Sequence, residues 1–214
     1  MGPNVDKLFL ELRGRPVVAH SWARFDQSGL FNHLTIVVRE GMQDAFQDLA
    51  KKFSFKTPFQ LVAGGKERQD SVWNGLSALP SGAEVVAIHD AARPCTSIDL
   101  IARTIAAARQ TGAAVAAQPV TDTIKESADG KRIERTLERS RLWAVQTPQT
   151  FQVPVIRRAI SEARARGLVL TDDTAACELI GQPVDLVASH QPNPKVTRPE
   201  DLPYIELLLG QEKS

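Results

Sequence analysis

Short runs of β-branched and other apolar residues alternate along the chain with amphipathic stretches. Four such runs cover residues 34–38, 59–62, 85–88 and 113–117, and each is too continuous in apolar residues for one strand face to be exposed. We expect all four to be buried central strands. Strands that alternate with helices typically form a mostly parallel sheet whose faces the helices cover. The pattern therefore predicts an α/β fold.

The remaining elements follow from helical spacing and shorter apolar runs. Val72, Leu76 and Leu79 share one face of a predicted helix, and Gly112 marks the end of another. In chain order we expect helices over 44–53, 69–79, 97–109, 153–166 and 171–180, strands over 142–146 and 184–187, and a last helix after Pro199.

The segment 119–140 interrupts this alternation. It is polar and rich in threonine and charge, and Asp129-Gly130 is typical of a hairpin turn. We predict a projecting two-stranded β-arm within a single domain over 1–214. Because an isolated two-stranded hairpin is only marginally stable in water, the arm should pack on another surface, and we expect a second subunit.

Composition narrows the classes of partner. Hydrophobic residues make up 43% of the chain, enough for a substantial core. The 26 basic and 25 acidic residues leave a net charge of +1, which provides no overall field for nucleic acid or a membrane surface. The start has no apolar signal core, and no run is long enough to span a membrane. Cys95 and Cys177 lack metal-site spacing, so we interpret both as small buried residues in a reducing, cytoplasmic setting.

Candidate chemistry lies just after the apolar runs, because ligands of open α/β sheets bind beyond the carboxyl ends of the strands. Gly64 and Gly65 follow the second run and would let backbone amides approach a phosphate at a helix start. A flexible turn before a helix capped by Asp70 and Ser71 explains the same residues. Both interpretations stay open at this point.

The stretch His89-Asp90-Ala91-Ala92-Arg93-Pro94 follows the third run. A carboxylate at Asp90 can hold a divalent cation, and the guanidinium of Arg93 can clamp a phosphate. A local ion pair between these two residues that closes a turn is the alternative. We interpret His89 as a hydrogen-bonded structural residue, which is the commoner role of a histidine at the end of an apolar strand.

A third cluster lies late in the chain. Thr171, Asp172 and Asp173 precede a predicted helix, where they serve equally well as a helix N-terminus or as ligand contacts. Lys195 follows the last strand in a proline-restricted loop. It is either aimed at a phosphate or solvated.

These motifs together resemble one family, the 2-C-methyl-D-erythritol 4-phosphate cytidylyltransferases. The order and spacing match from about Lys7 to the end of the chain. The resemblance implies a Rossmann-like nucleotidyltransferase fold, a homodimer clasped through the β-arm, CTP as co-substrate, Mg²⁺ as cofactor, and a role in non-mevalonate isoprenoid synthesis. The motifs are Gly64 to Val72, His89 to Pro94, Asp122 to Lys125, Leu142 to Gln149, Thr171 to Asp173 and Lys195 to Thr197.

The implied reaction is in-line attack by the sugar-alcohol phosphate on the α-phosphorus of CTP, with release of pyrophosphate. It needs no protein nucleophile, so cations and amide donors matter most. By resemblance, Lys7 and Lys195 stabilise the reacting phosphate, and Asp90 also binds the metal. The nucleotide contacts are Gly64, Gly65, Ser71, Asp90 and Ala91. The methylerythritol phosphate contacts are Asp90, Arg93 and Thr171, with Thr123, Arg139 and Thr147 from the neighbouring arm.

The beginning of the chain departs from the family pattern. The family opens with a buried strand and a glycine-rich loop around the triphosphate, whereas Met1-Gly2 stands where that loop ends. Either translation starts further upstream, or the chain is a remnant without the loop. Each buried backbone group left unpaired by a missing central strand costs roughly 1–3 kcal/mol, against a total stability of roughly 5–15 kcal/mol. We expect the 214-residue chain to be inactive or poorly folded and an extended version to be active.

Two other functions fit many of the same motifs. A ribitol 5-phosphate cytidylyltransferase shares the glycine pair and the Asp90 to Pro94 turn, and a non-catalytic homologue could keep only the polyol-phosphate pocket. Thr171-Asp172-Asp173 and Lys195-Val196-Thr197 favour methylerythritol phosphate.

Overall fold

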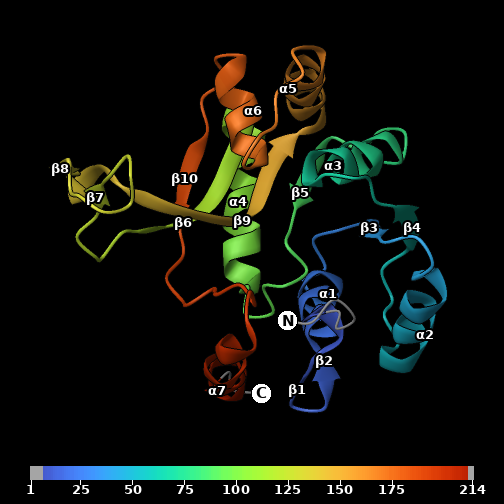
Figure 1. The fold of residues 1–214 in the computed structure, drawn as a ribbon. Coiled ribbons are helices and arrows are strands. Elements are labelled where there is room, and N and C mark those ends of the chain that lie inside the picture. The colour runs from blue at the N-terminus through green and yellow to red at the C-terminus, as the bar shows by residue number, and fades with distance from the viewer. Residues whose placement is uncertain (1–6, 212–214) are drawn as a thin grey trace.

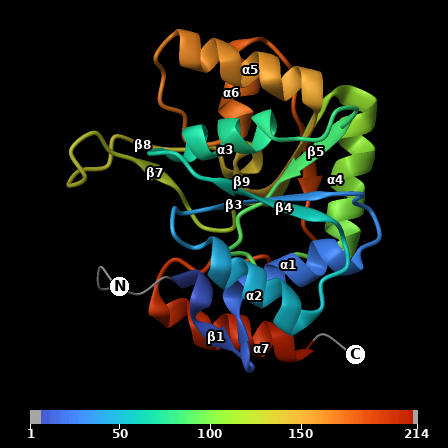
Figure 2. The same ribbon diagram turned by 90° about the vertical axis from the view of Figure 1, so that its right-hand side faces the viewer.

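The computed structural model describes residues 7–211 (Figures 1 and 2). The described elements, in chain order, are η1 (Lys7–Phe9), β1 (Glu11–Leu12), β2 (Arg15–Pro16), α1 (Val17–Gln27), β3 (Leu34–Val38), α2 (Gln43–Phe53), β4 (Phe59–Ala63), α3 (Arg68–Ser77), β5 (Val85–Ile88), α4 (Ile98–Thr111), β6 (Ala113–Pro119), β7 (Lys125–Glu126), β8 (Arg135–Thr136), η2 (Arg139–Arg141), β9 (Trp143–Gln152), α5 (Val153–Ala165), α6 (Asp173–Leu179), β10 (Asp185–Ala188), η3 (Pro199–Asp201) and α7 (Leu202–Gln211).

The main sheet has four strands in the order β10-β6-β9-β5. β10 and β6 are parallel, and β9 runs antiparallel to both β6 and β5. β3 and β4 form a separate parallel pair. Figures 1 and 2 show α4 along the main sheet, α3 and α5 at one end of the molecule, and α1, α2 and α7 at the other. The predicted α/β class is confirmed.

The expectation of four buried central strands is right only for β6. Its residues 113–117 are at most 1% exposed, whereas most residues of β3, β4 and β5 are partly exposed. β4 lies at the edge of the separate pair, and none of the described strands pairs with the second edge of β3 or of β5. Continuous apolar sequence therefore marks strands that line an open space here, as well as strands inside a sheet.

α1 is the largest element that the sequence interpretation missed. Pro16 at its start and two valines in its first turn gave no helical signal, yet its packing is extensive. Trp22 is 4% exposed, and its ring stacks on Phe55 with centroids 4.7 Å apart. The helix thereby joins the core that also holds β3 and α2.

The segment 119–140 carries the β7–β8 hairpin, which projects from the body in Figure 1. At its tip, Asp129 accepts hydrogen bonds from the backbone N–H groups of Lys131 and Arg132, and Gly130 has a φ of +67°. A left-handed φ of this kind is why glycine suits the turn.

The two cysteines are buried, as expected from the sequence. Cys95 and Cys177 are buried and free, and burial raises the pKa of Cys177 to about 12, which makes its thiol inert. None of the helices in residues 7–211 is both long and apolar enough to cross a membrane.

Candidate active site

The carboxyl ends of β3 and β5 open onto a cavity of about 310 Å³. Its walls bring together residues from distant parts of the chain. Lys7 comes from η1, Val38 ends β3, Asp90 and Ala91 follow β5, and Lys195 lies in the loop after β10. The structure thus places four of the predicted site residues around one space.

Asp90 is the electrostatic centre of this cavity. Its Oδ2 lies 2.9 Å from Nζ of Lys195 and 3.5 Å from Nε of Arg93. Burial alone would raise the pKa of Asp90, but the hydrogen bond and charge of Lys195, with the charges of Arg93 and Arg68, outweigh burial and hold that pKa below its ordinary value. The carboxylate is therefore ionised at neutral pH and orients two cations. Lys195 is paired rather than simply solvated.

Arg93 is held by two contacts but is not fully hydrogen-bonded. Its Nη1 donates to the backbone oxygen of Asn193 at 2.7 Å, and its buried Nε lies 3.5 Å from the Asp90 carboxylate without forming a hydrogen bond. A buried, unsatisfied N–H group is costly, so a phosphate oxygen that reached Nε would be strongly favoured.

Asn193, which lies between Pro192 and Pro194, anchors the loop that carries Lys195. The Asn193 side chain is 2% exposed, accepts from the Thr96 hydroxyl at 2.8 Å and donates to the Thr147 carbonyl at 2.9 Å. These bonds fix the loop beside β9. Asn193 is a residue that sequence reasoning missed, and its position between two prolines was the available signal.

His89 supports the site without facing it as an acid or base. Nδ1 accepts from the Thr147 hydroxyl at 3.0 Å, and Nε2 lies 3.2 Å from the carbonyl of Arg93. Since a carbonyl only accepts, this pattern assigns the single ring proton to Nε2. Burial lowers the pKa of His89 to about 4, so the ring is neutral at physiological pH.

Thr147 lies next to Asp90 in the chain described. The resemblance groups it with the contacts from a neighbouring arm, and that role in substrate binding stays a prediction. Thr147 lies in β9, and its hydroxyl accepts from the backbone N–H of Asp90 at 3.1 Å. Thr123 and Arg139 do lie in the arm segment and are exposed; Arg139 donates to the carbonyl of Thr121. Within residues 7–211 neither of them forms a hydrogen bond or an ion pair with Asp90.

The glycine pair forms a tight entry into α3. The Ser71 hydroxyl accepts from the backbone N–H of Gly65 at 3.0 Å, and Glu67 with Asp70 forms the helix-capping box. A Cβ at Gly65 would lie 2.2 Å from that of Asp70, so only glycine fits. The structure therefore gives Ser71 and Gly65 a local structural role and leaves their predicted nucleotide contacts as predictions.

A buried ion pair connects α3 to α6. Arg68 donates both terminal nitrogens to Asp173 at 2.8 and 2.7 Å, and the Asp173 side chain is 1% exposed. Burial raises the pKa of Asp173 above its ordinary value even though the guanidinium of Arg68 opposes this. The bidentate geometry is that of an arginine–carboxylate pair. Asp172 caps α6, and Thr171 lies exposed just before it. Sequence reasoning gave Arg68 no separate role, because its partner lies 105 positions away along the chain.

The predicted metal site rests on one carboxylate. Among the described residues, no three or more histidine, cysteine or acidic side chains cluster as a metal-binding group. Magnesium is usually held by one or two carboxylates together with substrate phosphates, and Asp90 fits that arrangement.

The whole chain matches known sequences of one kind. The family model described as 2-C-methyl-D-erythritol 4-phosphate cytidylyltransferase matches residues 1–211. Proteins of that name from Bacillus licheniformis and Synechococcus elongatus are 40% and 41% identical over 213 and 212 residues. Those alignments cover 100% and 99% of this chain and 91% of each relative.

Solved structures agree. 4-Diphosphocytidyl-2C-methyl-D-erythritol synthase from Anaerococcus prevotii superposes with a TM-score of 0.88 at 28% identity, over 95% of this chain and 93% of that one. The 2-C-methyl-D-erythritol 4-phosphate cytidylyltransferase from Thermus thermophilus gives a TM-score of 0.80 at 32% identity, over 94% and 92%.

Proposed function

The chain belongs to the 2-C-methyl-D-erythritol 4-phosphate cytidylyltransferase family, and we propose that its site transfers CMP from CTP to 2-C-methyl-D-erythritol 4-phosphate. A phosphate oxygen of the sugar alcohol attacks the α-phosphorus, and the bond from that phosphorus to the β-phosphate oxygen breaks. The products are 4-diphosphocytidyl-2-C-methyl-D-erythritol and pyrophosphate. One observation carries the assignment of the centre: the cavity lined by Lys7, Asp90 and Lys195 at the carboxyl ends of two strands.

The two lysines supply the charge that this reaction needs. Negative charge grows around the α-phosphate as the two phosphate anions meet, so fixed cations lower the barrier. Lys195 is already oriented by Asp90 at 2.9 Å, and Lys7 lines the same cavity. We assign both to the α-phosphate and the leaving pyrophosphate.

Arg93 is suited to the phosphate of the acceptor. Among the described residues its buried Nε forms no hydrogen bond, although the Asp90 carboxylate lies 3.5 Å away, and Thr171 is exposed just before α6. We assign both to methylerythritol phosphate, with Thr147 placing the backbone of Asp90 beside it.

Mg²⁺ would join Asp90 to the phosphates of CTP. A bound divalent cation neutralises phosphate charge and fixes the triphosphate geometry. The protein's own contribution is to keep the Asp90 carboxylate ionised, which its lowered pKa ensures. In this proposal the ribose and base of CTP bind at Gly64, Gly65, Ser71 and Ala91.

We assign the β-arm to a homodimer. Ile133 in the hairpin is 65% exposed and Val145 at its base is 41% exposed, so both apolar side chains are accessible to a partner's surface. A partner's arm would also bring Thr123 and Arg139 to the acceptor phosphate. The cytoplasmic location stays a prediction.

Two measurements test the assignment. Pyrophosphate release from CTP and methylerythritol phosphate should fall roughly 10²–10³-fold in Lys195→Met, the usual effect of removing one transition-state donor, while exposed Lys56→Met serves as the matched control. Calorimetric binding of methylerythritol phosphate, which requires no turnover, should weaken in Arg93→Met. A clear preference for ribitol 5-phosphate in both measurements would overturn the substrate assignment.

A further inference from the structure

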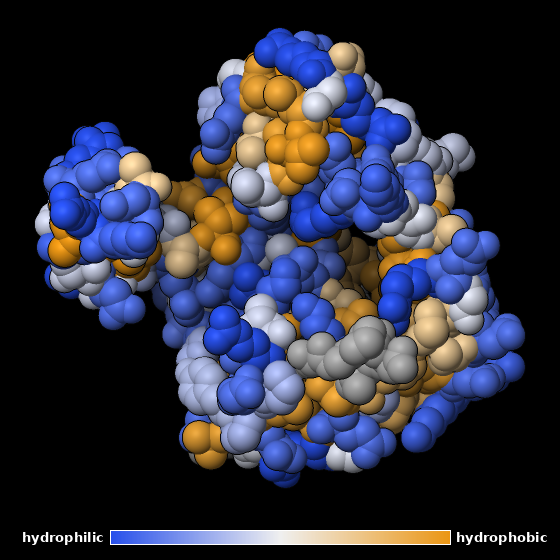
Figure 3. Space-filling view, viewed as in Figure 1, coloured by the Kyte–Doolittle hydropathy of each residue, from blue (hydrophilic) through white to orange (hydrophobic). Residues whose placement is uncertain are grey.

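Two glutamines lie where the β-arm leaves the body of the molecule. Figure 3 shows the arm, on the left as in Figure 1, as a separate and mainly hydrophilic lobe. Gln118 is the last residue but one of β6, just before the arm, and Gln146 lies in the neighbouring strand β9, after the arm has returned. Nε2 of Gln146 donates to Oε1 of Gln118 at 3.1 Å. This hydrogen bond joins the two strands at the base of the arm.

The same two glutamines hold the loop that follows β10. Nε2 of Gln118 donates to the backbone oxygen of Gln191 at 3.2 Å. Oε1 of Gln146 accepts from Nδ2 of Asn193, also at 3.2 Å. The loop is thus held at two residues that flank Pro192. We call the three side chains of Gln118, Gln146 and Asn193 the amide clamp.

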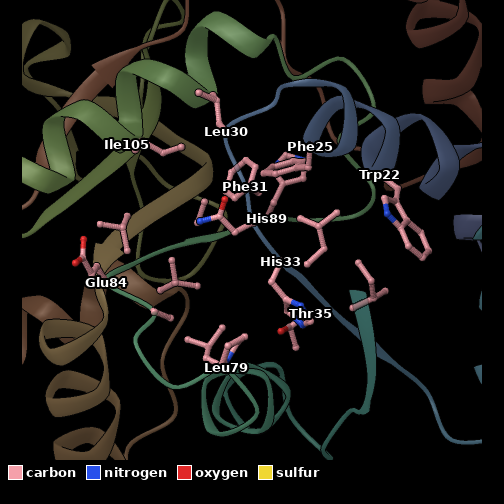
Figure 4. Close-up of a pocket in the computed structure, with 18 of the residues that line it drawn as sticks. Trp22, Phe25, Leu30, Phe31, His33, Thr35, Leu79, Glu84, His89 and Ile105 are labelled. Carbon is pink, nitrogen blue, oxygen red and sulfur yellow. The ribbon is translucent and has the colours of Figure 1, made fainter. Parts of the chain in front are cut away.

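The inner end of the amide clamp is fully hydrogen-bonded. Asn193 is 2% exposed; its second amide hydrogen goes to the carbonyl of Thr147 at 2.9 Å, and its side-chain oxygen accepts from the Thr96 hydroxyl at 2.8 Å. Because every polar atom of this side chain has a matching partner, the orientation of its amide group is fixed. Thr147 also contacts the ring of His89, which packs against Phe25 of α1 with ring centroids 4.8 Å apart (Figure 4). The clamp is therefore anchored in the core.

The loop held in this way orients two cations of the candidate site. The backbone oxygen of Asn193 accepts from Nη1 of Arg93 at 2.7 Å. Lys195 lies two residues further on, and the next N–H, that of Val196, donates to the carbonyl of Ala92 at 2.8 Å. A displacement of Asn193 would therefore move both cations. Displacement of a positioned group by about 1 Å can cost about 10²-fold in rate.

We propose that Gln146 and Asn193 are positioning residues for the transfer of CMP, which act by holding the loop of Lys195 in place. Neither residue lines the cavity around Asp90, so they act through other side chains. The inference rests on the function proposed above. Since Gln118 contacts both Gln146 and the loop, the placement of Lys195 also depends on the base of the β-arm. In a purely structural role these bonds would only satisfy buried polar groups.

Gln146→Met tests the amide clamp, because methionine is of similar length but offers no amide donor or acceptor. We expect the kcat of pyrophosphate release from CTP and methylerythritol phosphate to fall roughly tenfold, the scale of one lost hydrogen bond, while the KM for CTP stays unchanged. The matched control is Gln152→Met. Gln152 lies at the end of the same strand, is also partly buried, and donates to the carbonyls of Ala108 and Arg109. Its variant should keep the kcat of the unchanged chain.

Hydrogen exchange gives a readout that needs no substrate. The amide of Val196 should exchange faster in Gln146→Met than in the unchanged chain or in Gln152→Met, because its bond to Ala92 depends on the position of the loop. The calorimetric affinity for methylerythritol phosphate should weaken in Gln146→Met alone, since Arg93 loses its fixed acceptor. Circular dichroism verifies the fold of each variant.

Gln118 provides a second test that stands even if Gln146→Met unfolds. Gln118→Glu keeps an acceptor for Gln146, whereas Gln118→Met removes it, and this side chain is only partly buried. Both variants lose the bond to Gln191. A higher kcat in Gln118→Glu than in Gln118→Met therefore isolates the link to Gln146, and equal values would contradict that link.

Two results would overturn the proposal. One is an equal kcat and acceptor affinity in Gln146→Met and Gln152→Met. The other is a lower kcat with unchanged exchange of Val196, because the loop would then not have moved. Absence of turnover in the unchanged chain would contradict the proposed function instead. In that case the exchange of Val196 and the affinity for methylerythritol phosphate still decide whether the amide clamp positions the loop.

Discussion

The hydroxyl of Thr147 lies 3.0 Å from Nδ1 of His89 and accepts the backbone N–H of Asp90 at 3.1 Å. One side-chain oxygen of β9 therefore fixes both the ring after β5 and the backbone of the residue that pairs with Lys195. This arrangement makes the position of Asp90 depend on a residue that carries no charge.

Thr147→Val tests that dependence. Valine keeps the shape but leaves the Asp90 N–H and His89 Nδ1 unpaired in a mostly buried setting, so we expect the free energy of unfolding to fall by about 1–3 kcal/mol. Urea unfolding measures this change. Thr147→Ser retains the hydroxyl and should lose much less; equal losses in both variants would show that the methyl packing, rather than the hydrogen bonds, matters.

His89 predicts a pH dependence of stability. Its folded pKa of about 4 lies below the unfolded value near 6.5, so the unfolded chain binds more protons between these values. The stabilisation is complete above pH 6.5 and is lost as the pH falls towards 4, by up to about 3 kcal/mol. Urea unfolding at several pH values should show this slope.

The slope should be smaller in His89→Gln. Glutamine can also accept and donate but does not titrate, so its unfolding free energy at pH 7 and at pH 4.5 should differ less than in the unchanged chain. An identical slope in the variant would assign the pH dependence to other groups.

The Arg68–Asp173 pair predicts a strong and non-additive effect. Arg68→Met leaves the buried Asp173 carboxylate without its opposite charge and should lower the free energy of unfolding by about 3 kcal/mol. The double variant with Asp173→Asn should lose less than the two single variants summed, because it leaves no unpaired charge.

The exposed pair Arg166–Glu162 is the control for that cycle. Both of its side chains are more than one third exposed, so Arg166→Met should change stability by only about 0.5 kcal/mol. Effects of equal size at Arg166 and Arg68 would show that burial of Asp173 does not set the cost.

Most of the fold follows from periodicity in the sequence. The helices α2 to α5 and strands β3 to β6 lie within a few residues of their predicted bounds, because glycines and polar turns interrupt each apolar run. α1 was not predicted because Pro16 precedes Val17 and Val18 at its start, and β-branched residues favour strands when they are considered locally. Only packing against Phe55 and the rest of that core shows why the segment is helical.

The sequence identified many of the residues of the candidate site, but not which of them contact one another. Asp90, Arg93 and Lys195 were predicted as site residues because each follows a strand, and the structure places them next to one another. The contact of Thr147 with Asp90, the anchoring by Asn193 and the Arg68–Asp173 pair join residues 46 to 105 positions apart, which no local pattern encodes. Roles in ligand binding remain predictions that only substrate measurements can test.

The final prediction concerns the entry to α3. A methyl group at Gly65 would lie 2.2 Å from Cβ of Asp70 and 3.1 Å from the Asp70 carbonyl carbon, so the loop and the first turn of the helix must separate. Because Ser71 accepts the Gly65 N–H at 3.0 Å and Asp70 caps the helix, Gly65→Ala should disrupt both contacts. We expect CTP affinity to fall more than methylerythritol phosphate affinity, since the loop belongs to the proposed nucleotide side. Calorimetric titration of the two substrates separates these effects, with Lys66→Ala, an exposed neighbour in the same loop, as the control. An unchanged CTP affinity in a folded Gly65→Ala protein would remove this loop from the nucleotide site.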